Sequence, residues 1–212
     1  MKIIFTSPFN PLWSKGLSEL ASILDAKMVS IGDLLRAELK SNSVLGKQIE
    51  KFLESGEPLK PELVSDLLSQ RFFHDSASKI LINYPMNKMQ AESLSEYIKT
   101  SAYPLSACVV VNLNKESTTE KFKRQFHCED SLHPNLETTE IDPKCNICGT
   151  SMKRSYDLKN DKVAHLIDSY FNDNGVLSSV SMLGSTLGIK AIFYTTPKEV
   201  ADQIIGLNNK SV

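Results

Sequence analysis

Two cysteines separated by two residues form the part of the sequence best suited to hold a metal ion. Cys145 and Cys148 stand in the segment C-N-I-C-G, where Gly149 permits the tight turn that lets both thiolates reach one ion. Cys128 offers a third thiolate, and His133, five residues later, is the candidate fourth ligand. Because four protein ligands leave no open position for water, we predict a structural Zn²⁺ site. The alternative is a hydrogen-bonded hairpin without metal.

The start of the chain has the order of elements in which phosphate-binding loops occur. It opens with the apolar run Lys2–Phe5, a turn and an amphipathic segment from Trp13. Farther along, the segment I-G-D-L-L-R begins a helix with Asp33 near its start and places Arg36 one turn later. The turn before Trp13 is therefore a candidate for phosphate binding.

The stretch V-S-I-G-D-L-L-R-A-E-L-K-S-N-S-V-L-G and the later G-E-P-L-K-P-E-L-V-S-D-L-L resemble the AMP-binding half of adenylate kinases. The resemblance extends over nearly the whole chain. It implies a P-loop-kinase-like α/β fold with a doubly wound parallel sheet. Residues 1–122 and 158–212 would form the core, residues 31–74 a helical AMP-site insertion, and residues 123–157 a small zinc-ribbon-like lid.

The resemblance also implies roles for individual residues. Gly32, Arg36 and Gln90 would contact AMP. Arg124 and Arg154 would contact the phosphoryl group during transfer. For the metal in the lid, the family's first two ligand positions fall on His127 and Asp130, and these two residues stand as alternatives to Cys128 and His133.

The phosphate-binding loop departs from the family's pattern. Adenylate kinases carry G-x-P-G-x-G-K-G-[ST] after the first strand, where this chain has S-P-F-N-P-L-W-S-K-G over residues 7–16. Trp13 falls on the position of the lysine, no glycine lies between Ser7 and Lys15, and two prolines remove backbone N–H donors. Lys15 could serve as a displaced lysine, but the loop around it would still lack glycines. We predict that ATP and Mg²⁺ are not held here in the family's manner.

Several charged positions of the family are also changed. Met86 stands where a second arginine would hold the AMP phosphate, Ile82 where an aspartate would orient Mg²⁺, and Glu120 where a lid arginine would lie. Each lost charged donor would cost about 10²–10³-fold in rate.

The leading hypothesis is therefore an adenylate-kinase-like protein that is catalytically inactive and serves as a structural or protein-binding component of a larger assembly. The first alternative is a divergent active adenylate kinase that converts ATP and AMP to two ADP, with Lys15, Arg124 and Arg154 in its active site. The second is an AMP sensor that uses Gly32, Arg36 and Gln90. Against AMP binding, Arg36 and Gln90 would make structural contacts instead, to Asp33 or to the backbone.

The elements that position these residues follow from hydrophobic periodicity. Strands alternate with helices, which predicts a doubly wound parallel sheet, with the run 105–113 as a central strand and the polar segment 114–157 as an interruption. The predicted strands are Lys2–Phe5, Met28–Ser30, Lys79–Tyr84, Leu105–Leu113 and Lys190–Thr195. The predicted helices are Trp13–Leu24, Gly32–Lys40, Val44–Glu54, Pro61–Phe73, Lys88–Thr100, Asp161–Asn172, Val176–Leu187 and Pro197–Ile205, the last capped by Gly206.

Composition sets limits on the remaining classes of function. The chain has 212 residues, 41% of them hydrophobic, and a formal net charge of −1, which gives no electrostatic footprint for nucleic acid. Only four of its 24 basic residues are arginine, few for a site that transfers phosphate. No apolar run approaches the length of a membrane span, and because the first predicted strand begins at residue 2 we expect no signal or transit peptide within this sequence. Four cysteines favour a reducing compartment, so we expect an intracellular protein, cytoplasmic by default, with a mitochondrial or other organellar location as the alternative.

Overall fold

The structure is a computed structural model that describes residues 1–8, 13–55, 59–111, 113–129, 136–156 and 161–208. Its main sheet has five parallel strands in the order β2-β3-β1-β4-β8. Because β1 lies in the middle of this order, the chain winds outward to both edges. The predicted doubly wound α/β fold is confirmed. The strands are β1 Lys2–Thr6, β2 Lys27–Ser30, β3 Lys79–Ile82, β4 Ala107–Val110 and β8 Ala191–Phe193.

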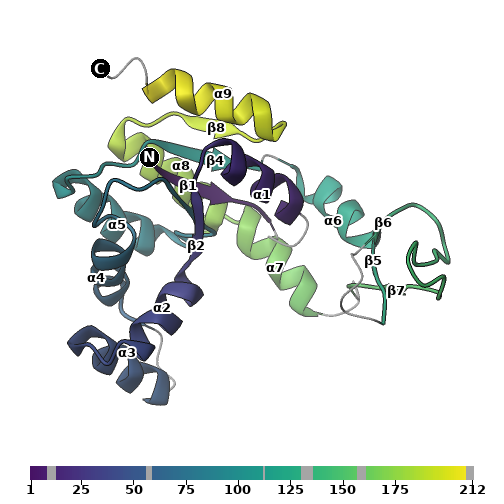
Figure 1. The fold of residues 1–212 in the computed structure, drawn as a ribbon, viewed down its shortest axis with the longest axis horizontal. Coiled ribbons are helices and arrows are strands. Elements are labelled where there is room, and N and C mark those ends of the chain that lie inside the picture. The colour runs from purple at the N-terminus through teal and green to yellow at the C-terminus, as the bar shows by residue number, and fades with distance from the viewer. Residues whose placement is uncertain (9–12, 56–58, 112, 130–135, 157–160, 209–212) are drawn as a thin grey trace.

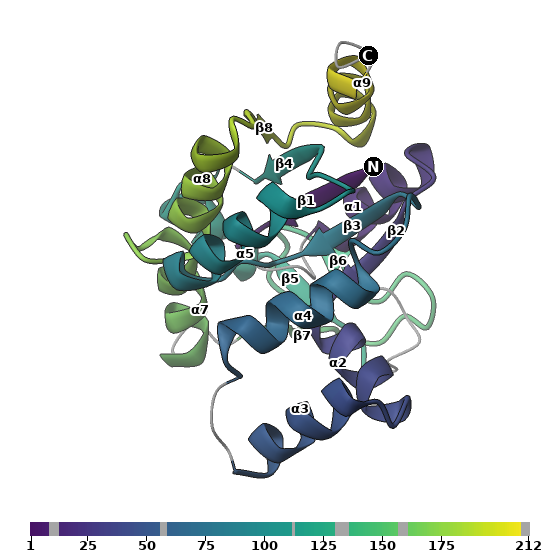
Figure 2. The ribbon, with the colours of Figure 1, turned by 90° about the vertical axis from the view of Figure 1, so that its left-hand side faces the viewer.

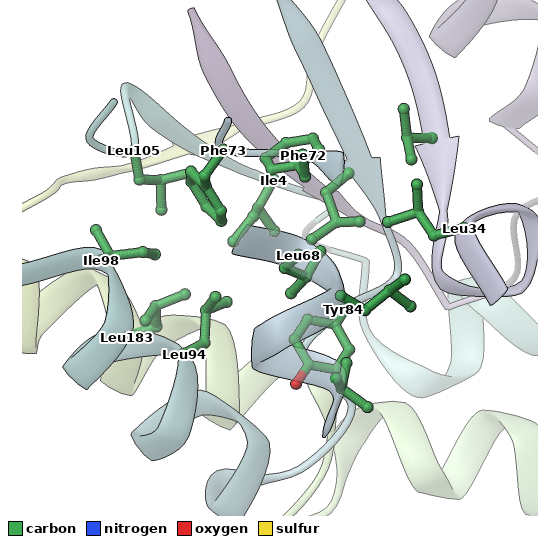
Figure 3. Close-up of a cluster of buried hydrophobic side chains, with 14 of the residues drawn as sticks. Ile4, Leu34, Leu68, Phe72, Phe73, Tyr84, Leu94, Ile98, Leu105 and Leu183 are labelled. Atoms are coloured by element: carbon green, nitrogen blue, oxygen red, sulfur yellow. The ribbon is translucent and has the colours of Figure 1, made fainter. Parts of the chain in front are cut away.

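Helices cover both faces of this sheet, as Figure 1 shows. Alternate strand residues point to opposite faces, so Ile3 and Phe5 pack with α1 (Ser14–Ile23) and α9 (Pro197–Asn208). Ile4 points the other way, into a cluster with α4 (Pro61–Arg71), α5 (Lys88–Thr100) and α8 (Val176–Leu187). This second cluster is the larger one, and Figure 3 shows its aromatic and aliphatic side chains interlocked beneath the strands.

A helical segment extends away from the sheet, formed by α2 (Ile31–Lys40), α3 (Val44–Ser55) and α4 (Figure 2). Ser30 caps α2 by accepting a hydrogen bond from the Asp33 N–H. Glu38 is fully buried beneath this segment, where Arg71 Nε donates to its carboxylate over 2.7 Å and Ser43 donates a second bond. The Glu38 carboxylate therefore joins α2, the turn after it and α4.

A small second sheet lies beyond the main one, with strands in the order β6-β5-β7. Its strands are β5 Gln125–His127, β6 Leu136–Glu137 and β7 Lys153–Arg154, and they pair antiparallel. Two helices flank the passage to this sheet, α6 (Lys115–Lys123) and α7 (Asp161–Phe171) (Figure 1). On α7, the Tyr170 hydroxyl donates to the carbonyl of Val111 over 3.1 Å, which anchors the helix to the end of β4.

Two predictions about elements were wrong. The polar segment 114–157 is not only an interruption of the alternating pattern, because its residues 115–123 form helix α6, whose Asn114 cap accepts from the Ser117 N–H over 2.7 Å. Gly206 was expected to end the last helix, but α9 continues through it to Asn208. The Asn208 side chain donates to the carbonyl of Ile204 and supports this last turn.

A cluster of charges lies at the amino-terminal ends of β1 and β3. Lys2 is only 2% exposed, and its ammonium donates to the Asp75 carboxylate over 3.0 Å and to the carbonyl of Ala77 over 2.8 Å. Lys79 donates to the other Asp75 oxygen over 2.9 Å. Asp75 thus pairs with two lysines that the sheet buries, which is how buried charges are tolerated.

Candidate functional site

The turn after β1 leads into a group of aromatic side chains. The Trp13 ring lies edge-on to Tyr194, with 6.0 Å between ring centroids, and Tyr194 lies edge-on to Phe5 at 5.5 Å. A Cβ atom on Gly16 would lie 2.0 Å from the Tyr194 hydroxyl oxygen, so this glycine gives room to a tyrosine ring. Burial raises the pKa of the Tyr194 hydroxyl. Residues 9–12 of the loop, which include Asn10 and Pro11, lie outside the described residues.

Trp13 also contacts a lysine from α6. The Lys121 ammonium lies 4.8 Å from the centre of the indole ring and donates to the Glu137 carboxylate over 3.1 Å. These residues border a cavity of about 450 Å³ whose charged lining is mixed, with three carboxylates beside two cations. The charged residues of this lining are Glu116, Glu120, Lys121, Arg124 and Glu137. Lys15, the candidate displaced lysine, is exposed on α1.

Gly32 and Arg36 lie together at the start of α2. A Cβ on Gly32 would stand 3.3 Å from Nη1 of Arg36, so the glycine allows the guanidinium to fold back over the first turn. There Arg36 Nη2 donates to Asp33 over 2.6 Å, and the Ser30 hydroxyl donates to the other Asp33 oxygen over 2.6 Å. The hydrogen bond from Ser30, followed by that from Arg36, lowers the pKa of the Asp33 carboxyl. Arg36 therefore has an anionic partner within its own helix.

Gln90 makes a structural contact to the backbone, the alternative to AMP binding that was considered for this residue. The backbone N–H of Met86 donates to its Oε1 over 2.8 Å, so the amide closes the turn between the end of β3 and α5. Both structural contacts named above, Arg36 with Asp33 and Gln90 with the backbone, are present. Gly32 and Gln90 nevertheless line one cavity of about 420 Å³, while Arg36 is absent from its lining.

Three cysteines come together beside the small sheet. The sulfur atoms of Cys128, Cys145 and Cys148 all lie within 4.8 Å of one another, and those of Cys128 and Cys148 are 3.6 Å apart. Tetrahedral Zn²⁺ with bonds of about 2.3 Å would place neighbouring sulfur atoms about 3.8 Å apart, so the arrangement fits a zinc ion. Among the described residues, His127 does not join this group. His133 and Asp130, the other candidate ligands, lie outside the described residues.

The chemistry of the sulfur atoms also suits a metal. The Thr150 hydroxyl lies 3.1 Å from the Cys148 sulfur, and hydrogen bonds from Thr150, with smaller ones from Cys128 and Cys145, lower the pKa of Cys148 to about 6. A thiolate is the form that binds zinc. Gly149 adopts a φ of 73°, the left-handed conformation expected of the glycine in this turn. Cys108 lies apart in β4, where burial raises the pKa of its thiol to about 12.

The two lid arginines occupy different surroundings. Arg154 donates to the carbonyl of Lys123 and stacks 5.0 Å from the centre of the Phe126 ring. Arg124 ends α6 and lines the mixed-charge cavity beside Trp13. Arg154 is thus engaged in the small sheet, whereas Arg124 faces the cavity.

Sequence reasoning missed Tyr194 and Lys121 as residues of these sites. Tyr194 follows the last strand and Lys121 lies on the unpredicted helix, so neither is near Trp13 in the sequence. The one local signal was Gly16, a glycine inside a helix, which often marks a close approach by another group.

No family model matches the chain. Curated proteins named adenylate kinase do resemble it. The one from Thermococcus onnurineus is 26% identical over 67% of this chain and 65% of its own length, and the one from Elusimicrobium minutum is 31% identical over 59% of each. The one from Rhizorhabdus wittichii is 26% identical over 80% of this chain and 82% of its own length. The match therefore spans less than two thirds of the first two relatives and more than three quarters of the third.

The five-stranded parallel sheet between two helical layers is that of a P-loop-kinase-like α/β protein. Within this class of fold, the curated relatives that the chain resembles are adenylate kinases. In the described part of the chain, every helix is too short or too polar to cross a lipid bilayer.

Proposed function

We propose that this adenylate-kinase-like protein does not transfer phosphate from ATP to AMP and serves instead as a binding component of a protein assembly. The observation that carries the proposal is the packing of Trp13, at the position of the family's P-loop lysine, against the Tyr194 ring and beneath the Lys121 ammonium. A P-loop works because successive glycines let those N–H groups point at one phosphate. Here the glycine beside Lys15 accommodates an aromatic ring.

The surrounding charges support the same conclusion. Two cations line the cavity beside Trp13, and one of them, Lys121, is already paired with Glu137 and with the indole ring. Glu116 and Glu120 line the same cavity, and these two carboxylates would repel a triphosphate. On the acceptor side, Arg36 already donates to Asp33, whose carboxylate would repel a phosphate beside it.

We propose further that residues 123–157 form a lid held by one zinc ion. Cys128, Cys145 and Cys148 would supply three ligands, and His133 is the proposed fourth, with His127 and Asp130 as alternatives. Zinc would act there as a structural cross-link between the segments that carry its ligands.

A coupled assay of ADP formation tests the proposal. Purified protein with Mg²⁺, ATP and AMP should give no ADP above the blank, while one of the adenylate kinases related to it serves as the positive control. Lys15→Ala should be indistinguishable from the unmodified protein. Turnover that disappears in Lys15→Ala would instead establish the divergent active kinase and end the proposal.

A further inference from the structure

The last strand of the main sheet, β8, forms one edge of that sheet. In the described part of the chain β8 pairs with β4 alone, and it ends the strand order (Figure 2). The Tyr194 N–H, directly after β8, donates to the carbonyl of Val110 in β4. Because the backbone N–H and C=O groups of successive residues point to opposite sides of a strand, those of Ala191 and Phe193 point away from β4. The open side of β8 is therefore a template for a further strand.

Phe193 adds an exposed aromatic ring at this edge, since 56% of the residue is accessible. Ile192 packs with α1 and α9 on one face of the sheet, whereas Ala191 packs on the face that α8 covers. Successive side chains alternate between the two faces, so Phe193 shares the α8 face with Ala191. Helix α8 packs on β1 and β4, farther into the sheet. One exposed phenylalanine alone would need no explanation, but the same face also carries a cavity.

This cavity lies where the chain turns back from the end of α8 into β8. Its volume is about 410 Å³, and a cavity of about 150 Å³ is enough to hold benzene, so a phenyl ring has room here. A Cβ on Gly184 would lie 2.7 Å from the carbonyl oxygen of Ile189, so this glycine lets α8 approach the segment that enters β8. Helix α8 has no charged residue, so a ring could enter beside it without burying a charge of the helix. The lining residues are Ser181, Gly184, Ser185, Gly188, Ile189, Lys190 and Ala191.

We propose that β8 pairs with β8 of a second copy of this chain, so that two main sheets join at their edges. An antiparallel pairing on a twofold axis through Ile192 places Phe193 of each copy opposite Ala191 of the other. The backbone groups of these two residues, which point to the open side, would then bond to each other. Residues directly opposite in an antiparallel pair share a face. Each Phe193 ring would therefore lie against the cavity of the other copy, which Ala191 lines.

The register identifies a second copy as the occupant, because each copy supplies both the ring and the cavity that receives it. Such pairing of identical patches is the usual geometry of twofold dimers. The pairing brings no like charges together, since it sets Lys190 opposite Tyr194 of the other copy. Lys190 is the one charged residue among the described residues of the cavity lining, and an aromatic ring tolerates a nearby ammonium. This inference goes beyond the proposed function and does not depend on it, because the pairing of β8 is independent of phosphate transfer.

Sedimentation equilibrium of the full chain between about 5 and 500 µM tests the proposal. We expect a reversible monomer–dimer equilibrium with a Kd of roughly 10–100 µM, because a short strand and one ring per copy form a small interface. Phe193→Ala should weaken dimerisation about tenfold or more, as the loss of a central aromatic contact does. Leu53→Ala, at an apolar residue on α3 that is 50% exposed, is the matched control and should leave the Kd unchanged. A monomer at every concentration would overturn the proposal, and so would a dimer with the same Kd in Phe193→Ala.

Amide hydrogen exchange, read by NMR, tests the register. The amides of Ala191 and Phe193 should exchange more slowly in concentrated than in dilute samples, because both would donate to the other copy. The Ile192 amide points toward β4 and serves as the internal reference, so its exchange should not depend on concentration. In Phe193→Ala the protection of the Ala191 amide should be lost. Protection that rises at another surface and not at Ala191 would show a different interface and exclude the pairing of β8.

Discussion

Gly16 is a position where two opposing effects can be weighed by magnitude. Alanine is favoured over glycine within a helix by about 1 kcal/mol. At Gly16, however, the new Cβ would lie 2.0 Å from the Tyr194 hydroxyl oxygen, and the ring is held between Phe5 and Trp13. Overpacking of this kind costs about 1–3 kcal/mol, so it should exceed the helical gain.

We therefore expect Gly16→Ala to lower the free energy of unfolding by about 1–2 kcal/mol. Urea denaturation of the single and double variants measures it. Adding Tyr194→Phe should restore most of the loss, because the atom in conflict is removed. If the double variant is no more stable than Gly16→Ala alone, the tyrosine hydroxyl is not what occupies the space beside Gly16.

Asp75 stabilises the fold through its negative charge, which pairs with the ammonium groups of Lys2 and Lys79. The Lys79 ammonium, followed by that of Lys2, holds the pKa of the Asp75 carboxyl far below its usual range against the opposing effect of burial. Asp75→Asn would leave two buried ammonium groups without their anion. Because Asp75 is 36% exposed, water screens part of the loss, and we expect about 2 kcal/mol rather than the 3–5 kcal/mol of a fully buried pair.

The dependence on pH has a definite sign. A carboxylate with a depressed pKa stabilises the folded state fully above its unfolded pKa of about 3.9, and this contribution is lost as the pH falls further. The difference in Tm between the unmodified protein and Asp75→Asn should therefore shrink as the pH falls below about 4. Asp66→Asn, at an exposed carboxylate on α4, is the control. A difference that grows as the pH falls below about 4 would contradict the assigned ion pairs.

At the scale of elements, the small sheet β6-β5-β7 has few hydrogen bonds of its own to stabilise it. Its strands contain two or three residues each, and a sheet of this size is marginal in water without a further constraint. The three cysteines lie in the connections between its strands, Cys128 after β5 and both Cys145 and Cys148 between β6 and β7. A bound zinc ion would thus supply the constraint that the hydrogen bonds alone do not.

We expect about one zinc per chain, and a large loss of zinc in Cys145→Ser or Cys148→Ser. Cys108→Ala should retain the metal, because Cys108 lies in β4 and outside the cysteine cluster. Removal of zinc by a chelator should speed hydrogen exchange in residues 125–154 and leave the β1 amides protected. Equal zinc content in the Cys145→Ser and Cys108→Ala proteins would exclude the proposed ligands.

The main sheet was predictable because its strands obey a local rule. Ile3, Ile4 and Phe5 form an unbroken apolar run, as a strand covered on both faces requires. Helix α6 has only a weak hydrophobic pattern, because Thr118 and Phe122 are its only buried residues. Its signal was the capping asparagine, a weaker cue than periodicity.

The sites were predictable only in part, for a related reason. The cysteines at 145 and 148 could be paired by spacing, because a turn brings them together. Tyr194 and Lys121 reach Trp13 from distant parts of the chain, and no local pattern reports such contacts. Arg36 was a candidate phosphate reader by residue type, whereas its partner in the structure is Asp33 on its own helix, the structural contact that was the alternative interpretation.

At the scale of the whole molecule, the amino-terminal and carboxyl-terminal ends of the parallel strands carry different kinds of residue. The amino-terminal ends of the strands carry the pairs of Lys2 and Lys79 with Asp75, and the carboxyl-terminal ends lead to Trp13, to the cavity lined by Gly32 and Gln90, and to α2. Because the strands are parallel, these two groups of residues are separated by the length of a strand.

That separation has an evolutionary consequence. Substitutions that disrupt a phosphate-binding loop fall at the carboxyl-terminal ends of the strands, whereas the ion pairs of Asp75 with Lys2 and Lys79 lie at the amino-terminal ends of β1 and β3. A lineage could therefore lose the ancestral reaction stepwise without passing through an unstable intermediate. Residues at the carboxyl-terminal ends of the strands could then change, while the ion pairs at the amino-terminal ends would preserve the fold in which a new ligand could be selected.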